Sequence, residues 1–172
     1  MDIMLDLETF GHTPDSVIVQ IGACYFNRNT GFIGDQILMN VDAVDGIDHG
    51  MKITAETMYW WLQQRLDARN SIISGDKFSL QRALMEFDEF VKEGANIWSH
   101  STFDMVILME NYRNLGIKPK FDYRNSCDIR TLVNLANIDV DSYDDVGIKH
   151  NALSDCLFQV KYVVDGLRKL GL

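Results

Sequence analysis

Five residues able to take part in acid–base or metal chemistry lie in three separated blocks of this 172-residue chain. Asp6 and Glu8 stand in an apolar N-terminal segment, and Asp104 opens an apolar helical run. His150 and Asp155 lie at the start of the last apolar stretch. Four carboxylates at the edges of hydrophobic segments are costly to bury unless cations neutralise them. The set therefore predicts a two-metal site for phosphoryl transfer, with the histidine as general base.

The spacing within each block supports this prediction to different degrees. Asp6 and Glu8 are two residues apart, so on an extended strand both side chains point to one face, where they repel one another unless a cation bridges them. The alternative for Glu8 is a solvated turn beyond the end of the strand. Asp104 and Asp155 each suit the first turn of a helix for dipolar reasons alone. His150, taken by itself, is typical of the surface of a loop.

Apolar periodicity predicts the elements that must position these residues. Three strands open the chain, over residues 2–7, 16–26 and 32–41, with a hairpin turn at 27–31. A short strand is expected at 96–99, and helical spacing with capping residues predicts helices over residues 54–66, 79–93, 102–115, 126–136 and 152–170. A three-stranded antiparallel meander followed by helices and further strands indicates an α/β fold, a mixed sheet with helices on its faces.

Composition indicates a single globular domain, residues 1–172, since 47% of the residues are hydrophobic and 24% are charged. No apolar run approaches membrane-spanning length and no basic segment precedes the N-terminal apolar stretch, so we expect no membrane contact and no signal peptide. Three scattered cysteines without a CxxC pair are typical of reduced thiols in the cytoplasm. The net charge of −9 disfavours binding of long duplexes and favours capture of a short terminus in a pocket.

The three blocks, in this order, resemble the DEDDh branch of the DnaQ-like 3′–5′ exonucleases, of the RNase T kind. They read Asp-Leu-Glu-Thr at 6–9, Phe-Asp at 103–104 and His-Asn-Ala-Leu-Ser-Asp at 150–155, and the match spans nearly the whole chain. Thr-Met-Tyr-Trp-Trp at 57–61 and Asp-Ala-Arg at 67–69 resemble a subgroup of short, single-domain phage and bacterial exonucleases. The resemblance implies a ribonuclease H-like fold, with parallel strands beside the meander and helices on both faces.

The resemblance also implies an activity, the metal ions it needs and the roles of individual residues. The enzyme would use two Mg²⁺ or Mn²⁺ ions to release nucleoside 5′-monophosphates from the 3′ ends of single-stranded DNA or RNA. Asp6, Glu8 and Asp155 would hold the ion nearest the attacking water, and Asp6 with Asp104 the second ion. His150 would accept the proton of that water, because a histidine with an ordinary pKa of about 6.5 titrates near neutrality.

Substrate contacts are expected from residues beside the acidic blocks, namely Thr9, Phe10, Phe103, Trp61 and His100. Thr9 and Phe10 match the place where the family contacts the terminal sugar and base, although packing explains Phe10 nearly as well. Of the adjacent Trp60 and Trp61, one is expected in the core and the other in the substrate cleft. Ser-His-Ser at 99–101 stands where the family carries asparagine and glycine, so we expect His100 to replace an asparagine hydrogen bond.

Other residues and other functions are weighed against this interpretation. Asp128 falls where the family carries an acidic residue, and we expect it to begin a helix or to support the ligands. We expect no functional role for His12 or His49. An idle binding module is disfavoured by the intact acidic set, and a dinucleotide-binding oxidoreductase by the missing glycine-rich turn after the first strand. The sequence leaves the choice between RNA and DNA open and permits a homodimer without indicating one.

Overall fold

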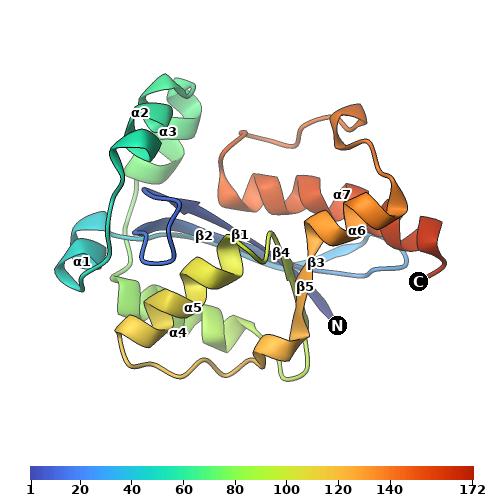
Figure 1. The fold of residues 1–172 in the computed structure, drawn as a ribbon, viewed down its shortest axis with the longest axis horizontal. Helices are drawn as coiled ribbons and strands as arrows, with labels where there is room; N and C mark the ends of the chain where they lie inside the picture. Colours follow the sequence, from blue (N-terminus) through green and yellow to red (C-terminus); the bar gives the residue numbers. More distant parts are fainter.

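The computed structural model describes residues 1–172 and contains one five-stranded mixed sheet with the strand order β3-β2-β1-β4-β5 (Figure 1). The antiparallel part consists of β1 (Asp2–Thr9), β2 (Ile18–Phe26) and β3 (Ile33–Asn40). β4 (Asn96–Ser99) runs parallel to β1, and β5 (Ser126–Asp128) runs parallel to β4. The predicted opening meander and the short strand at 96–99 are therefore confirmed.

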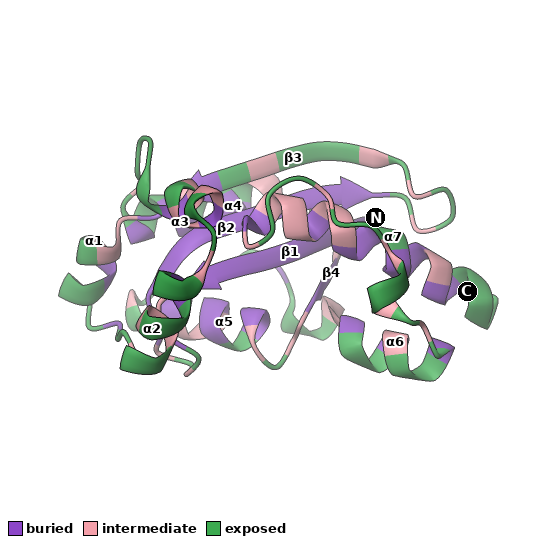
Figure 2. Ribbon diagram, turned by 90° about the horizontal axis from the view of Figure 1, so that it is seen from above, coloured by how far each residue is buried: buried purple, intermediate pink, exposed green.

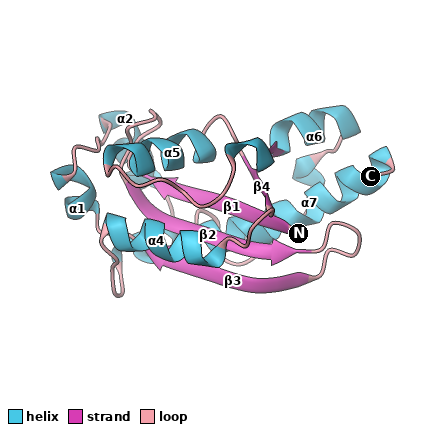
Figure 3. Cartoon of the chain, turned by 90° about the horizontal axis from the view of Figure 1, so that it is seen from below, coloured by secondary structure: helices cyan, strands magenta, loops and turns pink.

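Helices cover both faces of this sheet (Figure 3). On one face lie α4 (Leu80–Phe90) and α5 (Asp104–Asn114), and on the other lie α6 (Ile129–Ala136) and α7 (Ala152–Leu170). None of the helices combines the length and the apolar character needed to cross a lipid bilayer. Near the carboxyl end of β1 lie three short helices, α1 (Ala43–Asp48), α2 (Ala55–Gln63) and α3 (Leu66–Ile73).

The core is divided into two layers by the alternation of side chains along the central strand β1. Ile3, Leu5 and Leu7 pack with the apolar side chains of α4 and α5, whereas Met4 packs with those of α6 and α7. β1 and β2 are buried over their whole length and β3 is largely exposed (Figure 2). A strand buried on both faces needs an apolar sequence, and a polar residue within it must therefore have a specific partner or function.

Three predicted helix boundaries are wrong by three residues each. The helix expected over residues 79–93 ends at Phe90, because Val91 is extended with a ψ of 112°. The helix expected over residues 54–66 ends at Gln63, because Gln64 is extended with a ψ of 161° and a separate helix, α3, begins two residues later. The helix expected from residue 126 begins at Ile129, because Ser126–Asp128 pair with β4. The short helices α1 and α3 and the short strand β5 were not predicted. Such short elements are fixed by distant partners, which periodicity within a segment does not reveal.

Candidate active site

Asp104 lies where the parallel strands β1 and β4 separate. The two strands pair as far as Met4 and Trp98, and beyond that point the Asp104 carboxylate accepts one backbone N–H from each side. Its Oδ1 accepts the Leu7 N–H at 3.2 Å, and its Oδ2 accepts the His100 N–H at 2.8 Å. These bonds satisfy two donors that the separating strands leave unpaired. They also fix a buried carboxylate at the carboxyl ends of the strands.

Asp6 and Glu8 project from β1 toward α7. They alternate with Leu5 and Leu7, which pack on the opposite side of the sheet, and they share a face with Met4. Both carboxylates belong to the strand and both are buried. The alternative of a solvated turn for Glu8 is therefore excluded.

Gln20 and Gly22 of β2 bring the start of α7 over this acidic pair. They lie opposite Glu8 and Asp6 in the antiparallel register. A Cβ atom on Gly22 would lie 2.3 Å from the carbonyl carbon of Ala152, so only glycine permits this approach. Gln20 accepts the Ala152 N–H through Oε1 at 2.8 Å. Both β2 residues therefore place the first turn of α7 beside the carboxylates of β1.

Asp155 and His150 reach the site from this first turn and from the residue before its cap. Asn151 caps α7 by accepting the Ser154 N–H at 3.1 Å. His150 has a φ of 61°, in the left-handed region, and its N–H donates to Oδ2 of Asp155 at 3.1 Å. The His150 ring packs edge-on against Trp60, with ring centroids 4.7 Å apart. The turn, the hydrogen bond and the aromatic contact together hold the imidazole beside Asp155.

Burial and mutual repulsion change the pKa values of the clustered groups. Burial raises the pKa of Asp6 and of Glu8 well above their ordinary values, and the neighbouring carboxylates raise them further. Burial also raises the pKa of Asp104 to about 7 and that of Asp155 to about 6. The pKa of His150 is lowered by burial and by the nearby Lys149 cation. The fold thus concentrates negative charge that its own cations do not offset.

The donor set fits divalent cations. One ligand atom from each of Glu8, His150 and Asp155 lies within 4.8 Å of the other two, and Asp6 and Asp104 adjoin them. None of the ion pairs in the structure involves any of the four carboxylates. Clustered carboxylate oxygens are the donors that Mg²⁺ and Mn²⁺ prefer. A bound cation would allow these acids to ionise together.

A cavity of about 410 Å³ lies over the acidic residues, and we name it the Trp60 cavity. Of the residues expected to contact substrate, Thr9, Trp61, Phe103 and His100 line this cavity, whereas Phe10 does not. Phe10 instead lines a separate apolar cavity of about 230 Å³ and packs against the core. The register of β1 shifts between Glu8 and Thr9, and Phe10 lies in a bend beyond the end of the strand, so the alternation that puts Asp6 and Glu8 on one face does not extend to Phe10.

The two tryptophans of α2 both line the Trp60 cavity but differ in exposure. Trp61 is 3% exposed, and its Nε1 donates to the Thr9 carbonyl at 2.9 Å. Trp60 is 40% exposed and presents the accessible ring. His12, for which no role was expected, also lines the cavity from the loop after β1. Its position four residues beyond Glu8 was the only available signal in the sequence.

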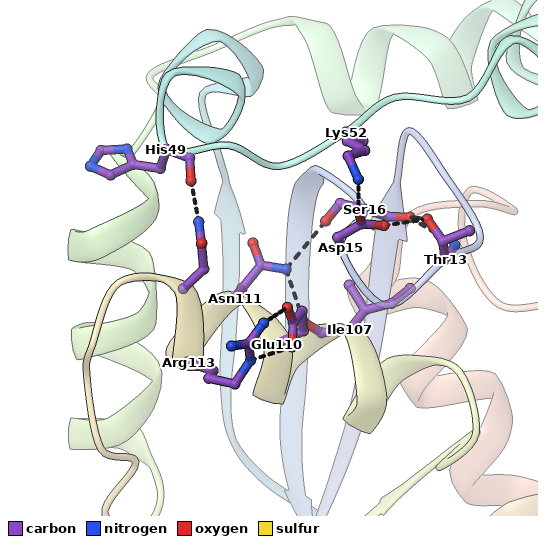
Figure 4. A network of polar contacts seen from close by, with 10 residues as sticks. Thr13, Asp15, Ser16, His49, Lys52, Ile107, Glu110, Asn111 and Arg113 are labelled. Atoms are coloured by element: carbon purple, nitrogen blue, oxygen red, sulfur yellow. Dashed lines mark hydrogen bonds and ion pairs between the residues drawn. The ribbon is translucent and has the colours of Figure 1, made fainter.

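A polar network anchors this loop to the rest of the fold (Figure 4). Asn111 of α5 is fully buried and donates Nδ2 to the Ser16 carbonyl at 3.2 Å. Lys52, from the segment before α2, pairs with Asp15 at 2.5 Å. The loop that carries His12 is therefore held both from α5 and from the chain that leads into α2.

His100 lies between the acidic cluster and α6. Burial and the nearby Arg130 cation lower the pKa of His100 to about 4, so its imidazole is neutral at pH 7. The His100 N–H donates to Asp104, but the buried Nδ1 has no hydrogen-bond partner within the protein. Asp128 begins α6, as expected, by accepting the Thr131 N–H at 2.8 Å.

Gln159 is a member of the site that sequence reasoning missed. Its Nε2 donates to Oδ1 of Asp6 at 2.7 Å, and the side chain is buried. It follows Asp155 by four residues, so both side chains leave α7 on the same face. That spacing was the signal that could have revealed it. An amide orients the carboxylate without a positive charge that would oppose metal binding.

Comparison with known proteins identifies the family. Residues 1–166 match the family model described as the Rv2179c-like 3′–5′ exoribonuclease domain. The chain belongs to this family. It is therefore a 3′–5′ exonuclease, and the predicted relationship to DnaQ-like exonucleases is confirmed. A comparison of this chain with curated protein sequences found no match.

Solved exonuclease structures share the fold. Escherichia coli exonuclease I in complex with a dT13 oligonucleotide superimposes with a TM-score of 0.67 at 12% identity over 99% of this chain, which spans only 41% of that protein. The nuclease domain of 3′hExo, a DEDDh family member bound to rAMP, superimposes with a TM-score of 0.64 at 13% identity. The match covers 97% of this chain and 91% of that domain. Exonuclease X in complex with 5′ overhanging duplex DNA superimposes with a TM-score of 0.56 at 19% sequence identity. The match covers 100% of this chain and 94% of exonuclease X. The expected ribonuclease H-like sheet is confirmed.

Proposed function

We propose that this exonuclease removes nucleoside 5′-monophosphates from single-stranded RNA 3′ ends with two Mg²⁺ or Mn²⁺ ions. The observation that carries the proposal is the convergence of Glu8, His150 and Asp155 within 4.8 Å, beside the buried Asp6 and Asp104. RNA is proposed as the preferred substrate over DNA because the matching family model describes exoribonucleases. The net charge of −9 supports a preference for single strands over the more densely charged duplex.

The carboxylates divide between two cations in this proposal. Asp6, Glu8 and Asp155 would hold one ion, and Asp6 with Asp104 would hold the second. Two such ions would supply positive charge that offsets the negative charge developing during the displacement. The raised carboxyl pKa values support this assignment, since a cation is what restores the ionised state of all four groups.

His150 is the general base. Its lowered pKa leaves the imidazole neutral at pH 7 and able to accept a proton. The water oxygen bonds to phosphorus, the bond from phosphorus to the penultimate 3′ oxygen breaks, and the water proton passes to His150. The leaving 3′ oxygen takes a proton from solvent. In this proposal the rings of Trp60 and Phe103, which line the Trp60 cavity, stack on the terminal base, a contact that does not depend on the identity of the base.

The decisive test is the digestion of 5′-labelled RNA and DNA oligomers of one sequence in the presence of Mn²⁺. We expect ladders that shorten from the 3′ end, release of mononucleotides, and faster digestion of RNA. Asp6→Asn and Asp155→Asn should abolish turnover, whereas Asp76→Asn, at an exposed position, should not. Full activity in both site variants would refute the proposal, and so would a wild-type enzyme that degrades neither polymer.

A further inference from the structure

The imidazole of His150 has no polar partner that orients it. The hydrogen bonds of His150 involve only its backbone, whose N–H donates to Asp155 and whose carbonyl accepts the Ser71 hydroxyl at 3.5 Å. Neither ring nitrogen forms a hydrogen bond or an ion pair within the protein. A histidine that acts as a general base usually has its second ring nitrogen bonded to a carboxylate or a carbonyl, which fixes the ring. Another contact must therefore set the orientation of this imidazole.

Two tryptophans of α2 pack against this imidazole. The centroid of the His150 ring lies 4.7 Å from that of Trp60, with 76° between the ring planes, and 6.3 Å from that of Trp61, with 78° between the planes. The two indoles also pack edge to face, with centroids 5.0 Å apart. Edge-to-face pairs at such distances attract one another. The rings of Trp60, Trp61 and His150 thus form one compact group, which we name the aromatic cluster.

Trp61 anchors the aromatic cluster to the strand that carries Glu8. Its Nε1 donates to the carbonyl of Thr9, the residue that follows Glu8. Trp60 lies between Trp61 and His150, because its centroid is nearer to each of these rings than they are to one another. Trp60 is therefore the contact through which the end of β1 fixes the position of the imidazole.

The backbone of His150 is held separately from its ring. The fully buried Gln20 accepts the Ala152 N–H through Oε1 and donates Nε2 to the Ser71 carbonyl at 3.0 Å, so it connects the start of α7 to α3. The bond from the His150 N–H to Asp155 completes this arrangement. None of these contacts involves an aromatic ring. Removal of the Trp60 ring should therefore release the imidazole and leave the main chain in place.

We propose that Trp60 is a positioning residue for the reaction, because its indole holds the His150 imidazole in the orientation that accepts the proton of the attacking water. This inference rests on the proposed function. A general base must lie within roughly 2.6–3.2 Å of the atom that gives up the proton, so a small displacement of the ring lowers the rate strongly. This role acts through His150 and on kcat. It is separate from the stacking of Trp60 on the terminal base.

The first measurement is kcat at saturating single-stranded RNA and Mn²⁺ for variants of α2. Trp60→Leu should lower kcat roughly tenfold and leave the Mn²⁺ affinity within about twofold of wild type, because the carboxylates keep their places. Trp60→Phe keeps an aromatic ring and should lose less than about threefold. Tyr59→Leu is the matched control and should leave kcat unchanged, because Tyr59 is 66% exposed on the same helix and lies outside the Trp60 cavity.

A double-mutant cycle with His150→Ala separates positioning of the base from a general structural effect. In a chain that already lacks the imidazole, Trp60→Leu should change kcat by less than about twofold, because no base remains to be positioned. Damage to the metal site would lower kcat equally in both backgrounds and would weaken Mn²⁺ binding. If Trp60 only stacked on the terminal base, its removal would raise KM and leave kcat at the wild-type value.

Three results would overturn the inference: a wild-type kcat in Trp60→Leu, equal losses in Trp60→Phe and Trp60→Leu, or a loss that persists in the His150→Ala background. If the wild-type enzyme releases no mononucleotide, or if His150→Ala keeps the wild-type kcat, the proposed function itself fails, and this inference with it. The two failures are therefore distinguishable in one set of assays.

Discussion

Gln159 of α7 donates to Oδ1 of Asp6 on β1 at 2.7 Å, and Oδ2 of Asp6 forms no hydrogen bond. The helix that carries Asp155 thus also orients the carboxylate proposed to contact both cations. The bond favours the charged form of Asp6, against the effect of burial and of the neighbouring acids.

Replacing Gln159 by leucine removes the donor and keeps a side chain of similar volume. Outer-shell hydrogen bonds to metal ligands typically contribute a factor of roughly 10–100 in metal affinity. Gln159→Leu should therefore weaken Mn²⁺ binding by about that factor in calorimetry and raise the Mg²⁺ concentration needed for half-maximal rate. Gln81→Leu, exposed on α4, is the control. An unaltered Mn²⁺ affinity in Gln159→Leu would show that the bond is only structural.

His150→Ala should lower kcat by roughly 10²–10⁴-fold, the usual contribution of a general base. Because the pKa of His150 is lowered, the pH at which kcat at saturating metal falls to half its maximum should lie below about 6.5, the ordinary histidine pKa. Calorimetric titration should give the same Mn²⁺ affinity in the variant and the wild type. His49→Ala, at an exposed site, serves as control. A loss of Mn²⁺ affinity in His150→Ala would make the imidazole a ligand.

Metal-free enzyme should lose stability as the pH rises from about 4 to above about 7. Asp104 and Asp155 have folded pKa values of about 7 and about 6 against an ordinary value of 3.8. Groups raised in this way bind protons more tightly in the folded state, so their stabilising contribution is full below the unfolded pKa and is lost as the pH passes the folded pKa. Melting temperature measured in EDTA should therefore fall over this window.

Two controls test whether the decrease of melting temperature with pH arises from the acidic site. Mg²⁺ should largely remove the decrease, because cations stabilise the ionised carboxylates. Asp104→Asn should flatten the slope in EDTA, whereas Asp76→Asn, exposed and distant in sequence, should keep the wild-type slope. A melting temperature that rises with pH in EDTA would contradict the predicted burial of these acids.

Gly22→Ala should displace the start of α7, because the new Cβ would lie 2.3 Å from the Ala152 carbonyl carbon. Overpacking of this kind costs about 1–3 kcal/mol of unfolding free energy. The rate should fall as well, since Asp155 and His150 move with the helix. Gly46→Ala is a matched control, as the atom nearest to its new Cβ would be a methyl carbon of Val17, at 3.4 Å. Urea denaturation and mononucleotide release measure both effects, and wild-type values for Gly22→Ala would refute the close contact.

Much of the fold could be predicted from local patterns. The meander, β4, α4 and α7 follow from runs of apolar residues bounded by turn and capping residues, which act within one segment. β5 and α3 could not be predicted in this way. β5 has only three residues and is a strand because it pairs with β4. α3 is separated from α2 by an extended Gln64, with no glycine or proline to mark the break.

The sequence by itself indicated the family, the sheet-and-helix architecture and the five candidate acid–base residues, because residue type and order along the chain carry these features. The tertiary structure alone decided which neighbours complete the site. It turned Phe10 away from the acidic cluster, exposed the ring of Trp60, and joined Gln159 to Asp6. Contacts of this kind depend on how helices cross the sheet, and that crossing is set by packing between segments far apart in the chain.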